Sequence, residues 1–404
     1  MPPATAPPPD RSPVRVVHLT PHRDPFEPRT FFQCQSLAEA GFEVVLVAPH
    51  DRDLERDGVR LLAVPRYRSR LERVTRTAWR TVRRGLAAKP ALFHIHDPEL
   101  IPWGLVLRLT GRPVIYDVHE DYAQAAGVRD WIPGPARRLL AGLYAAAAAL
   151  ARRCFTVVIA ERYYARSFPG AVEVLNYAKT EEFAGLDAIA RIAPPRPRAL
   201  YTGSVTASRG GRHHARLLAQ LPAGAEVALV GVCPEADLAC ELLIQSQEDP
   251  RLILRTAERW VPRQTIVEAY GEAWTCGLAL FPDTPHYREK ELTKFFEYMA
   301  AGLPIVASAF PVWRRLIEGE RVGICVDPED PRAAAEAVLW LQEHPEEARA
   351  MGERGRLAVA RRFNWASQAG RLADLYRDLL GLPPGRAGDG CGKGALDPSG
   401  SAST

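Results

Sequence analysis

The feature that most constrains the fold of this chain is a repeated alternation of short aliphatic runs with segments of helical periodicity. Runs that are apolar at nearly every position are typical of parallel strands that helices cover on both faces. We predict strands in one series at residues 14–19, 43–48, 59–64, 91–95, 114–118, 156–160 and 172–175, and in a second series at 199–202, 226–230, 252–254, 277–281, 305–308 and 323–326. The pattern predicts an α/β protein with two Rossmann-like, doubly wound domains.

The stretch 179–198 separates the two series. It lacks their periodicity and ends in the sequence APPRPR, a stiff and polar composition that is typical of a linker. A chain of 404 residues is long enough for two domains. We therefore predict an N-terminal domain at 13–178, a linker at 179–197, a C-terminal domain at 198–362 and a last helix within 363–382. The ends, 1–12 and 383–404, carry few large apolar side chains and are expected to be disordered.

The bulk composition excludes some classes of protein. A formal charge of +4 is too small to indicate a nucleic-acid partner. Seven cysteines form no CxxC pair and no metal-ligand spacing, which favours a reducing cytoplasm over a disulfide framework. The N-terminus has no apolar core of signal-peptide length, and no run reaches 18 apolar residues. We expect a soluble, cytoplasmic protein.

Residues 66–89 are strongly basic, with nine Lys or Arg residues against a single acid, Glu72. Between the basic residues, apolar side chains recur at helical spacing: Leu71, Val74, Ala78, Trp79, Val82 and Leu86. A basic amphipathic helix of this kind can rest on an anionic membrane surface with Trp79 at the interface. The alternative, which is compatible with the first, is a helix whose apolar stripe packs on the first sheet while its arginines face solvent.

The strongest candidate for a binding site is the segment 289–304, EKELTKFFEYMAAGLP. Its helix is expected to begin near Leu292. A helix start offers free N–H groups and a positive dipole end to a diphosphate, and Lys294 adds a charge for the same anion. Glu297 is placed to accept hydrogen bonds from ribose hydroxyls. The alternative is a solvated amphipathic helix with Glu–Lys pairs and a glycine C-cap at Gly302.

Polar residues also follow two predicted strands of the first domain. His119 comes after the strand at 114–118, where a structural role is as plausible as a functional one. His96, Asp97 and Glu99 follow the strand at 91–95 and are candidates for a pocket. Because Asp97 precedes Pro98, we favour for Asp97 a role as helix N-cap with proline at N1.

The segment 294–317, KFFEYMAAGLPIVASAFPVWRRLI, with Glu289 before it, resembles the donor-site signature of the retaining GT-B glycosyltransferases (glycosyl transferases group 1, family 4 type) in its bacterial branch. The resemblance implies that Glu297 holds the ribose of the donor and that Glu289 contacts the transferred sugar. Thr293 and Lys294 match a Thr-Lys pair found in many bacterial relatives. The sequence departs from the family at 291–292, which read Glu-Leu where relatives often have Phe-Gly.

The resemblance extends to the start of the second domain and to the first domain. In the segment YTGSVTASRGG at 201–211, it implies that Gly203 permits close backbone approach and that Arg209 pairs with the donor diphosphate. The segments FHIHDPELIPWG and VIYDVHEDYA also look like members of this family, and His119 falls where the family places an active-site histidine near the transferred sugar.

The remaining positions implied by the resemblance belong to the acceptor side. His96, Glu99 and Glu120 are expected there as part of a pocket. Many relatives carry a glycine pair in the first strand–helix loop, whereas here that loop reads PHRDPFEPRT without any glycine. Arg29, near the start of the first helix, is expected to substitute as a phosphate or acceptor contact. The matched region runs from about residue 14 to residue 380.

The resemblance implies a GT-B fold, with the C-terminal helix crossing back to the first domain, and a retaining glycosyltransferase. The expected donor is a nucleotide-diphosphate sugar. The expected acceptor is a glycan or lipid-linked hydroxyl in envelope polysaccharide or glycolipid synthesis, reached by a peripheral membrane contact through 66–89. No DxD motif or Asp-rich ligand cluster is present, so no metal and no cofactor are expected. The alternatives are a sugar-nucleotide epimerase of the same fold and a non-catalytic GT-B partner subunit.

Overall fold

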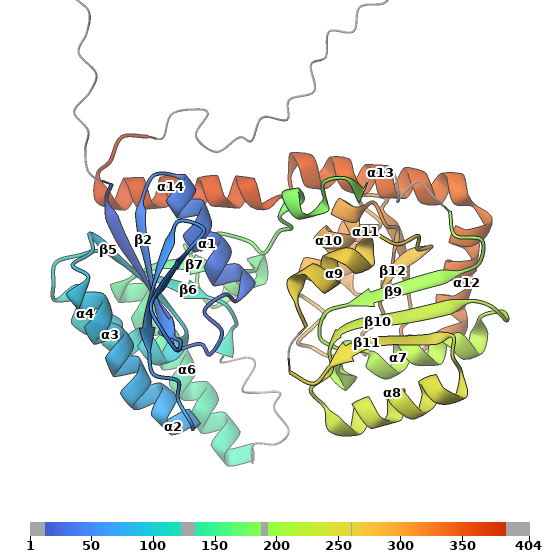
Figure 1. Cartoon of the computed structure of the whole chain (residues 1–404), viewed down its shortest axis with the longest axis horizontal. Coiled ribbons are helices and arrows are strands. Elements are labelled where there is room, and N and C mark those ends of the chain that lie inside the picture. The colour runs from blue at the N-terminus through green and yellow to red at the C-terminus, as the bar shows by residue number, and fades with distance from the viewer. Residues whose placement is uncertain (1–12, 123–133, 187–192, 260, 385–404) are drawn as a thin grey trace, which may run out of the picture. The chain divides into compact units, whose positions relative to one another are not determined.

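The computed structural model describes residues 13–122, 134–186, 193–259 and 261–384. The chain divides into two compact units. Unit 1 ends at Leu175 and resumes at Gln368, and unit 2 is Asn176–Ser367. The helix α14 (Trp365–Leu380) therefore places most of its length in unit 1, as the predicted return of the C-terminal helix requires (Figure 1). The expected disordered ends lie almost entirely outside the described residues.

Unit 1 is built on an eight-stranded sheet of order β3-β4-β2-β1-β5-β6-β7-β8. All neighbouring pairs are parallel except β3–β4. The strands are β1 (Arg15–Leu19), β2 (Glu43–Pro49), β3 (Leu54–Arg56), β4 (Val59–Val64), β5 (Leu92–His96), β6 (Val114–Val118), β7 (Thr156–Ile159) and β8 (Val172–Glu173). The helices that cover it are α1 (Pro28–Glu39), α2 (Arg70–Glu72), α3 (Ala78–Ala87), α4 (Ile101–Arg108), α6 (Gly134–Cys154) and α14.

The strand β3 was not predicted, because three residues are too few for a periodic signal. It forms a hairpin with β4 through Asp57 and Gly58, whose φ angles of 51° and 74° are both positive. Such a turn matches the twist of antiparallel strands, and Asp-Gly is its typical sequence.

Unit 2 carries a six-stranded parallel sheet of order β11-β10-β9-β12-β13-β14. Its strands are β9 (Arg198–Thr202), β10 (Glu226–Val232), β11 (Leu252–Ala257), β12 (Cys276–Ala279), β13 (Ile305–Ser308) and β14 (Gly323–Val326). Its helices are α7 (Gly211–Arg216), α8 (Ala236–Glu248), α9 (Arg263–Tyr270), α10 (Thr293–Ala301), α11 (Pro311–Ile317), α12 (Pro331–Glu343) and α13 (Pro345–Arg361). The order 3-2-1-4-5-6 is that of a doubly wound nucleotide-binding sheet, and the predicted fold class is confirmed.

Both sheets reverse their winding between the first strand and the fourth long strand, at β1/β5 in unit 1 and at β9/β12 in unit 2. Ligands of open α/β sheets bind beyond the carboxyl ends of the strands at such a point. In unit 1 the two faces of the sheet differ sharply there. Val17, Leu19, Phe93 and Ile95 point into an apolar core under α3, α4 and α6, whereas alternate residues of the same strands are histidines.

The basic segment differs from the single amphipathic helix that its pattern predicted. A π-helical stretch, Arg73–Thr77, interrupts the segment between α2 and α3. Because a π turn is wider than an α turn, the residues before it face a different direction from those after it. Ala78 and Val82 are buried, whereas Leu71, Val74 and Trp79 are 71%, 45% and 43% exposed.

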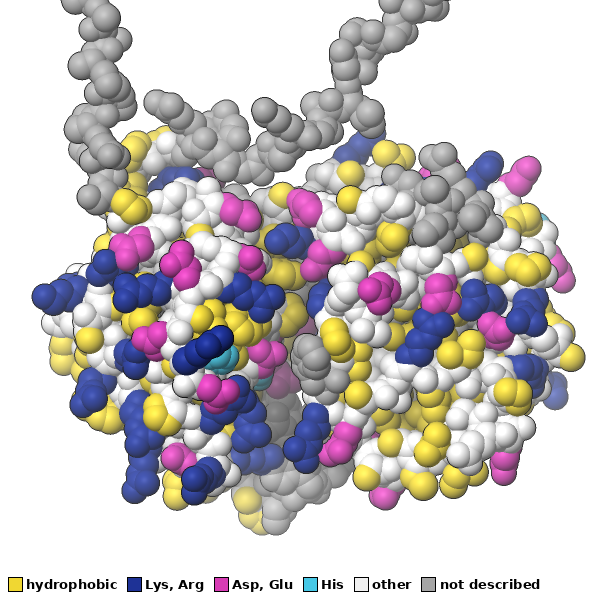
Figure 2. All heavy atoms as spheres, viewed as in Figure 1, with side chains coloured by type: hydrophobic (Ala, Val, Ile, Leu, Met, Phe, Trp, Pro, Cys, Tyr) yellow, Lys and Arg dark blue, Asp and Glu magenta, His cyan; other side chains and the backbone are white. Residues whose placement is uncertain are grey.

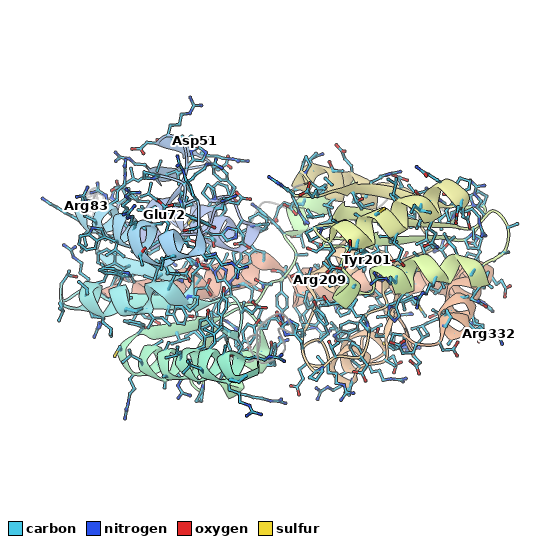
Figure 3. All side chains as sticks on the ribbon, turned by 90° about the horizontal axis from the view of Figure 1, so that it is seen from below. Asp51, Glu72, Arg83, Tyr201, Arg209 and Arg332 are labelled. Atoms are coloured by element: carbon cyan, nitrogen blue, oxygen red, sulfur yellow. The ribbon has the colours of Figure 1, made fainter. Side chains whose placement is uncertain are left out.

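The exposed part of this segment is basic as well as apolar. In the space-filling view, Lys and Arg side chains gather over the part of unit 1 where Figure 1 places α2 and α3 (Figure 2). Arg83 and Glu72 project from these helices in the perpendicular view (Figure 3). Among the described residues, no helix combines the length and the apolar character needed to cross a membrane.

Candidate functional site

The strand β9 of unit 2 ends in a glycine that lets the backbone pass close to its neighbour. Gly203 has a φ of 100°, and its N–H donates to the carbonyl of Val230 at 2.9 Å. A Cβ on Gly231 would lie 1.9 Å from the Gly203 carbonyl oxygen. The chain then turns through the short 3-10 helix Ala207–Arg209 into α7. Figure 3 labels Tyr201 and Arg209, which border this turn.

Lys294 lies in the first turn of α10 beside this glycine. The helix has Leu292 at its N-cap and no side-chain cap hydrogen bond, so its first N–H groups are available to an anion. The Lys294 ammonium is buried and has no hydrogen-bond partner, and Nζ lies 3.5 Å from the centroid of the Tyr201 ring. Burial, and then the neighbouring Arg209, hold the pKa of Lys294 well below its ordinary value. A cation held only by aromatic faces lacks its counter-ion, which an anionic ligand would supply.

Glu297 lies one turn further along α10 and is also buried. Its Oε2 accepts a hydrogen bond of 2.8 Å from the Tyr270 hydroxyl, and its Oε1 lies 2.6 Å from Nη1 of Arg263. Arg263 also donates to Glu182 at 2.6 Å, so it is shared between two carboxylates. An ionised carboxylate offers about four lone-pair positions, so Glu297 retains capacity for the hydroxyls of a ligand.

The other predicted residues of unit 2 lie around this group. Thr293 is exposed at the first position of α10, and Glu289 is half-buried in the loop before it. That loop is fixed by the Trp313 indole, which donates to the carbonyl oxygen of Lys290 at 2.6 Å. The structure therefore gathers Gly203, Arg209 and Lys294, with Glu297 one helical turn away, at the carboxyl end of β9.

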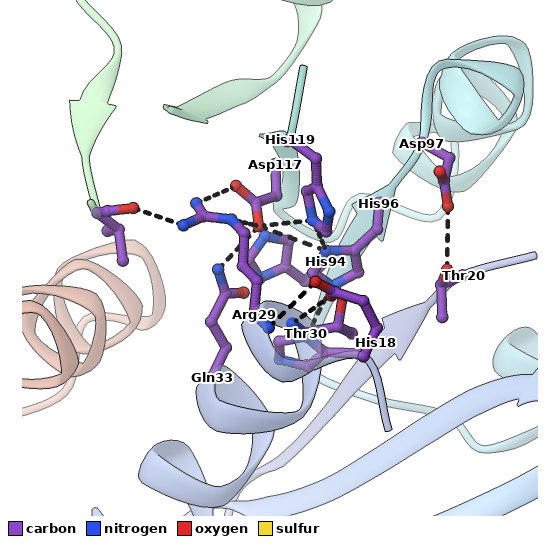
Figure 4. Close-up of polar contacts among 12 residues, drawn as sticks. His18, Thr20, Arg29, Thr30, Gln33, His94, His96, Asp97, Asp117 and His119 are labelled. Carbon is purple, nitrogen blue, oxygen red and sulfur yellow. Dashed lines mark hydrogen bonds and ion pairs between the residues drawn. The ribbon is translucent and has the colours of Figure 1, made fainter. Parts of the chain in front are cut away.

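The corresponding edge of unit 1 is organised by a buried aspartate, Asp117, on β6. The Arg29 guanidinium donates to it through Nε at 3.0 Å and Nη2 at 2.6 Å, and Gln33 Nε2 donates at 2.8 Å (Figure 4). Burial alone would raise the pKa of Asp117, but Arg29 and His119 hold it well below its ordinary value. The third contact of Arg29 is to the carbonyl of Val174 at 2.7 Å. Arg29, predicted to contact a phosphate or acceptor, is thus buried and committed to the fold, because an aspartate on the sheet neutralises it.

His119 follows β6 and is the most accessible ring of this group, with 22% of its side chain exposed. Its Nε2 lies 3.1 Å from Oδ2 of Asp117 and 3.0 Å from Nδ1 of His96. Burial would lower the pKa of His119, but Asp117 and Glu27 raise it above its ordinary value. Glu27 accepts from the backbone N–H groups of Arg29 and Thr30, so the start of α1 fixes this carboxylate near the ring.

His96 lies beneath His119 and is completely buried. It was predicted to form part of a pocket, but in the structure it lines no open one. Asp97 is the N-cap residue of the 3-10 helix Pro98–Leu100, with Pro98 at its first position as predicted, but its side chain makes no capping hydrogen bond. Its φ is 75°, and its carboxylate accepts from Thr20 Oγ1 at 3.0 Å and pairs with Arg73 at 2.9 Å instead of capping a helix. Arg73 also pairs with Glu99 at 2.5 Å. Burial, and then Asp97, raise the pKa of Glu99.

Glu120 lies at a small hollow beside this edge of unit 1. The hollow is lined by residues of three elements and the loops between them: Pro98, Ile101, Tyr116, Glu120, Asp121, Tyr122, Tyr144, Ala148 and Phe168. Of the predicted acceptor residues, Glu99 and Glu120 are half-buried, as is the predicted catalytic His119, while Arg29 and His96 are buried.

Among the described residues of unit 1, two groups have the spacing of a metal site: the fully buried His18, His94 and His96, and the group His96, Asp117 and His119. His96 Nδ1, Asp117 Oδ2 and His119 Nε2 lie 3.0 to 3.4 Å apart. However, Oδ2 already accepts from both Arg29 and Gln33, and a guanidinium beside the site repels a second cation. An N–H on His119 accounts for its short distances to Asp117 and His96, so these residues do not fit a divalent ion.

Several residues of the two sites were missed from the sequence. Asp117, His18 and His94 lie within predicted strands, and only their alternation with apolar residues marks them as one polar face. Tyr376 is a lone tyrosine on the last helix, and Arg263 and Tyr270 open and close α9. For these three no local signal exists, because their partners are distant in the chain.

Two protein families match the chain, one in each half. Residues 26–178 match the glycosyl transferase 4-like domain, and residues 264–358 match the glycosyl transferases group 1 domain. The chain belongs to the group 1 glycosyltransferases. Arg29 and His119 lie in the first match and Lys294 and Glu297 in the second, whereas Gly203 and Arg209 lie between the two matches.

Curated relatives match this group 1 chain over a limited stretch. A D-inositol 3-phosphate glycosyltransferase of Corynebacterium kroppenstedtii is 35% identical over 100 residues, which are 25% of this chain and 22% of the relative. A GDP-mannose:cellobiosyl-diphosphopolyprenol alpha-mannosyltransferase of Xanthomonas oryzae is 32% identical over 87 residues, which are 22% of this chain and 23% of the relative. The chain thus matches less than a quarter of the length of these relatives.

Solved structures share the fold over nearly the whole chain. Sucrose-phosphate synthase from Thermosynechococcus elongatus has a TM-score of 0.73 at 20% identity, over 91% of this chain and 99% of that one. Anabaena HepE, solved in complex with UDP and glucose, has a TM-score of 0.68 at 15% identity, over 90% and 99%. The likeness shows the GT-B fold.

Proposed function

We propose that the protein transfers a sugar from a nucleotide-diphosphate sugar to an acceptor hydroxyl. The observation that carries this proposal is the buried, unpartnered Lys294 ammonium at the uncapped start of α10, beside Gly203 and Arg209. A diphosphate at this position would be contacted by the Lys294 ammonium, the Arg209 guanidinium and the first N–H groups of α10 together. Glu297, held by Tyr270 and Arg263, would accept hydrogen bonds from ribose hydroxyls. Family membership and the nucleotide complexes of Anabaena HepE support this assignment.

In the proposed reaction the acceptor oxygen attacks the anomeric carbon on the face from which the diphosphate departs. The bond between that carbon and the phosphate oxygen breaks, and this oxygen takes the proton of the acceptor hydroxyl. The departing diphosphate gains negative charge, which Lys294, Arg209 and the α10 N–H groups stabilise. These groups supply the positive charge without a divalent metal. Retention of configuration is part of the proposal and is supported by the family resemblance alone.

The proposed roles in unit 1 concern the sugar and the acceptor. The inner nitrogen of His119, Nε2, is held by Asp117 and His96, so Nδ1 is the ring nitrogen left for a sugar hydroxyl. Glu120 is proposed on the acceptor side. Glu289 is proposed to contact the transferred sugar.

We propose a lipid-linked or envelope-glycan acceptor that is met at an anionic membrane surface. Leu71, Val74 and Trp79 are exposed on the basic segment, beside Arg80 and Arg83. Apolar side chains surrounded by arginines complement an anionic bilayer. A polyprenol-linked acceptor is named for the Xanthomonas relative, which lends support to this class. Replacing Leu71 and Trp79 by Ser should weaken binding to vesicles containing anionic lipid, and equal binding by the double variant would exclude this surface.

Thermal-shift titration with UDP-, GDP-, ADP- and TDP-sugars tests the donor assignment. A donor at about 100 times its dissociation constant adds about 2.7 kcal/mol to the free energy of unfolding, which is readily measured. Glu297→Ala should remove the shift, whereas Glu289→Ala should retain most of it and lose transfer activity. An absence of any shift with all four donors would overturn the proposal. Turnover of a UDP-sugar without acceptor would instead favour an epimerase.

A further inference from the structure

Four histidines and one tyrosine form a continuous hydrogen-bonded chain inside unit 1. His119 Nε2 lies 3.0 Å from His96 Nδ1, and His96 Nε2 lies 3.0 Å from His18 Nδ1. His18 Nε2 lies 3.0 Å from the hydroxyl of Tyr376 on α14, which lies 2.7 Å from His94 Nδ1. His96 and His18 thus each use their two ring nitrogens on two different neighbours. Figure 4 shows the part of the chain formed by His119, His96 and His18. His18, His94 and His96 have no exposed surface.

Strand register creates this chain. His18 on β1 and His94 on β5 are direct partners in the parallel pair, and His96 pairs with Asp117 on β6. Residues two apart on a strand share a face, so all four side chains point to the side of the sheet opposite the apolar core. The rings of His94 and His96 stack at a centroid distance of 4.5 Å.

The direction of the hydrogen bonds follows from Asp117, which can only accept. An unprotonated Nε2 on His119 would place its lone pair 3.1 Å from the Asp117 carboxylate, and the two would repel each other. Nε2 of His119 therefore carries a proton. His96 Nδ1 lies 3.0 Å from that nitrogen and 3.4 Å from Asp117, the longer of the two carboxylate distances, so in the arrangement proposed below it is unprotonated and accepts from His119. His96 therefore donates from Nε2 to His18, His18 donates from Nε2 to Tyr376, and Tyr376 donates to Nδ1 of His94.

The far end of the chain is closed. Nε2 of His94 is buried and has no hydrogen-bond partner in the described structure. A chain that passed protons would need an exit at this nitrogen, and none is present. Burial also keeps the pKa values of His18, His94 and His96 below their ordinary value, so these rings are neutral and each holds a single proton.

We propose that this chain, together with Asp117, holds the proton of His119 on its inner nitrogen, and that Tyr376 is the positioning residue that completes the chain. Without the Tyr376 oxygen, the Nε2–H of His18 loses its acceptor. The Nδ1–H tautomer of His18 then becomes the more favourable one. His96 must then carry its proton on Nδ1, where it opposes the Nε2–H of His119. The loss of the Tyr376 hydroxyl thereby changes the hydrogen bonding of His119, although His18 and His96 lie between them.

The inference rests on the proposed role of His119 only for its catalytic consequence, because the ring protons can be observed without any donor or acceptor. The charged and titratable groups that face His119 are Asp117 on β6, Glu27 and Arg29 at the start of α1, and His96 on β5. None of these contacts Tyr376 directly, so a change that begins at Tyr376 reaches His119 through His18 and His96.

NMR of the full chain labelled with 15N-histidine tests the proposal. Long-range 15N–1H spectra of the wild type should show His18, His94 and His96 as Nε2–H tautomers, with each signal assigned by its loss in a histidine-to-glutamine variant. In Tyr376→Phe, His18 and His96 should shift toward the Nδ1–H form. The titration midpoint of His119 should fall by about half to one pH unit, the size expected for one hydrogen bond.

Gln368→Leu is the matched control. It removes another buried α14 hydrogen bond, that of Oε1 with the Leu175 N–H at 2.9 Å, and leaves the chain of histidines intact. This variant should leave both the tautomers and the His119 midpoint unchanged. Nδ1–H tautomers in the wild type, or equal midpoints in Tyr376→Phe and wild type, would overturn the proposal even if donor binding is confirmed. Wild-type tautomers alone decide the question if Tyr376→Phe does not fold.

Discussion

Replacing Lys294 by Met separates binding from stability at the proposed diphosphate site. Met keeps the length of the side chain and removes the charge. In the empty site the ammonium is buried and makes no hydrogen bond, which costs about 1–3 kcal/mol for a polar group. The Tyr201 ring, 3.5 Å from Nζ, returns up to about 2 kcal/mol as a cation–π contact. The variant should therefore be as stable as the wild type, or more stable by about 1 kcal/mol.

Donor binding should respond in the opposite direction. A charge-assisted hydrogen bond to phosphate contributes about 1.5–3 kcal/mol, so the affinity for UDP, GDP or ADP should fall roughly tenfold to a hundredfold. Isothermal titration calorimetry measures this loss, and thermal unfolding measures the stability. Because burial and Arg209 hold the pKa of Lys294 below its ordinary value, a bound diphosphate should raise this pKa.

Lys290→Met is the charge-matched control, since it removes a lysine four positions earlier without touching the buried group. It should alter nucleotide affinity by less than about threefold. Unchanged nucleotide affinity in Lys294→Met would refute the diphosphate assignment. Destabilisation by more than about 2 kcal/mol would refute the argument that the ammonium is unsatisfied when the site is empty.

Three further substitutions test the two sites. Asp117→Asn removes the negative charge opposite the Arg29 guanidinium in the core and should destabilise unit 1 by about 3–5 kcal/mol in urea unfolding. The pKa of Asp117 is depressed in the folded state, so its contribution is present above about pH 4 and is lost as the pH falls further; a variant that loses as much stability on acidification as the wild type would contradict this. Glu297→Gln should weaken nucleotide binding about tenfold or more while preserving the fold by circular dichroism, and undiminished affinity would remove the ribose role. Gly210→Ala forces a Cβ to 1.7 Å from the Leu280 carbonyl oxygen at a φ of 74° and should lower the melting temperature markedly, whereas an unchanged melting temperature would show that this turn relaxes freely.

The strands were predictable because burial on both faces leaves an unbroken aliphatic signature. The predicted strands 59–64, 114–118, 305–308 and 323–326 coincide with β4, β6, β13 and β14. The start of α10 was predicted near Leu292, which is its N-cap residue in the structure. Its C-cap is Gly302, with a φ of 74°. The hairpin strand β3 was not predicted, because three residues are too few to show an alternating pattern.

The sites were predictable only where local sequence decides the chemistry. Lys294 and Glu297 belong to one short helix, and their spacing fixes their relation before any tertiary contact forms. Arg29 could not be placed in this way, because the partner that occupies it, Asp117, is 88 residues away. His96 likewise has distant partners, since its ring contacts His18, which is 78 residues away, and Asp117 on another strand.

The two edges of the sheet in unit 1 have a consequence for how this protein can associate. A parallel sheet ends in unpaired N–H and C=O groups that can recruit a strand from another molecule. Here one edge is the three-residue β3, with Glu55 and Arg56 exposed on it, and the other is the two-residue β8. Strands this short, one of them charged, leave an incoming strand little backbone to pair with. Self-association of unit 1 by strand addition is thus disfavoured, and its contacts with other molecules are left to side chains.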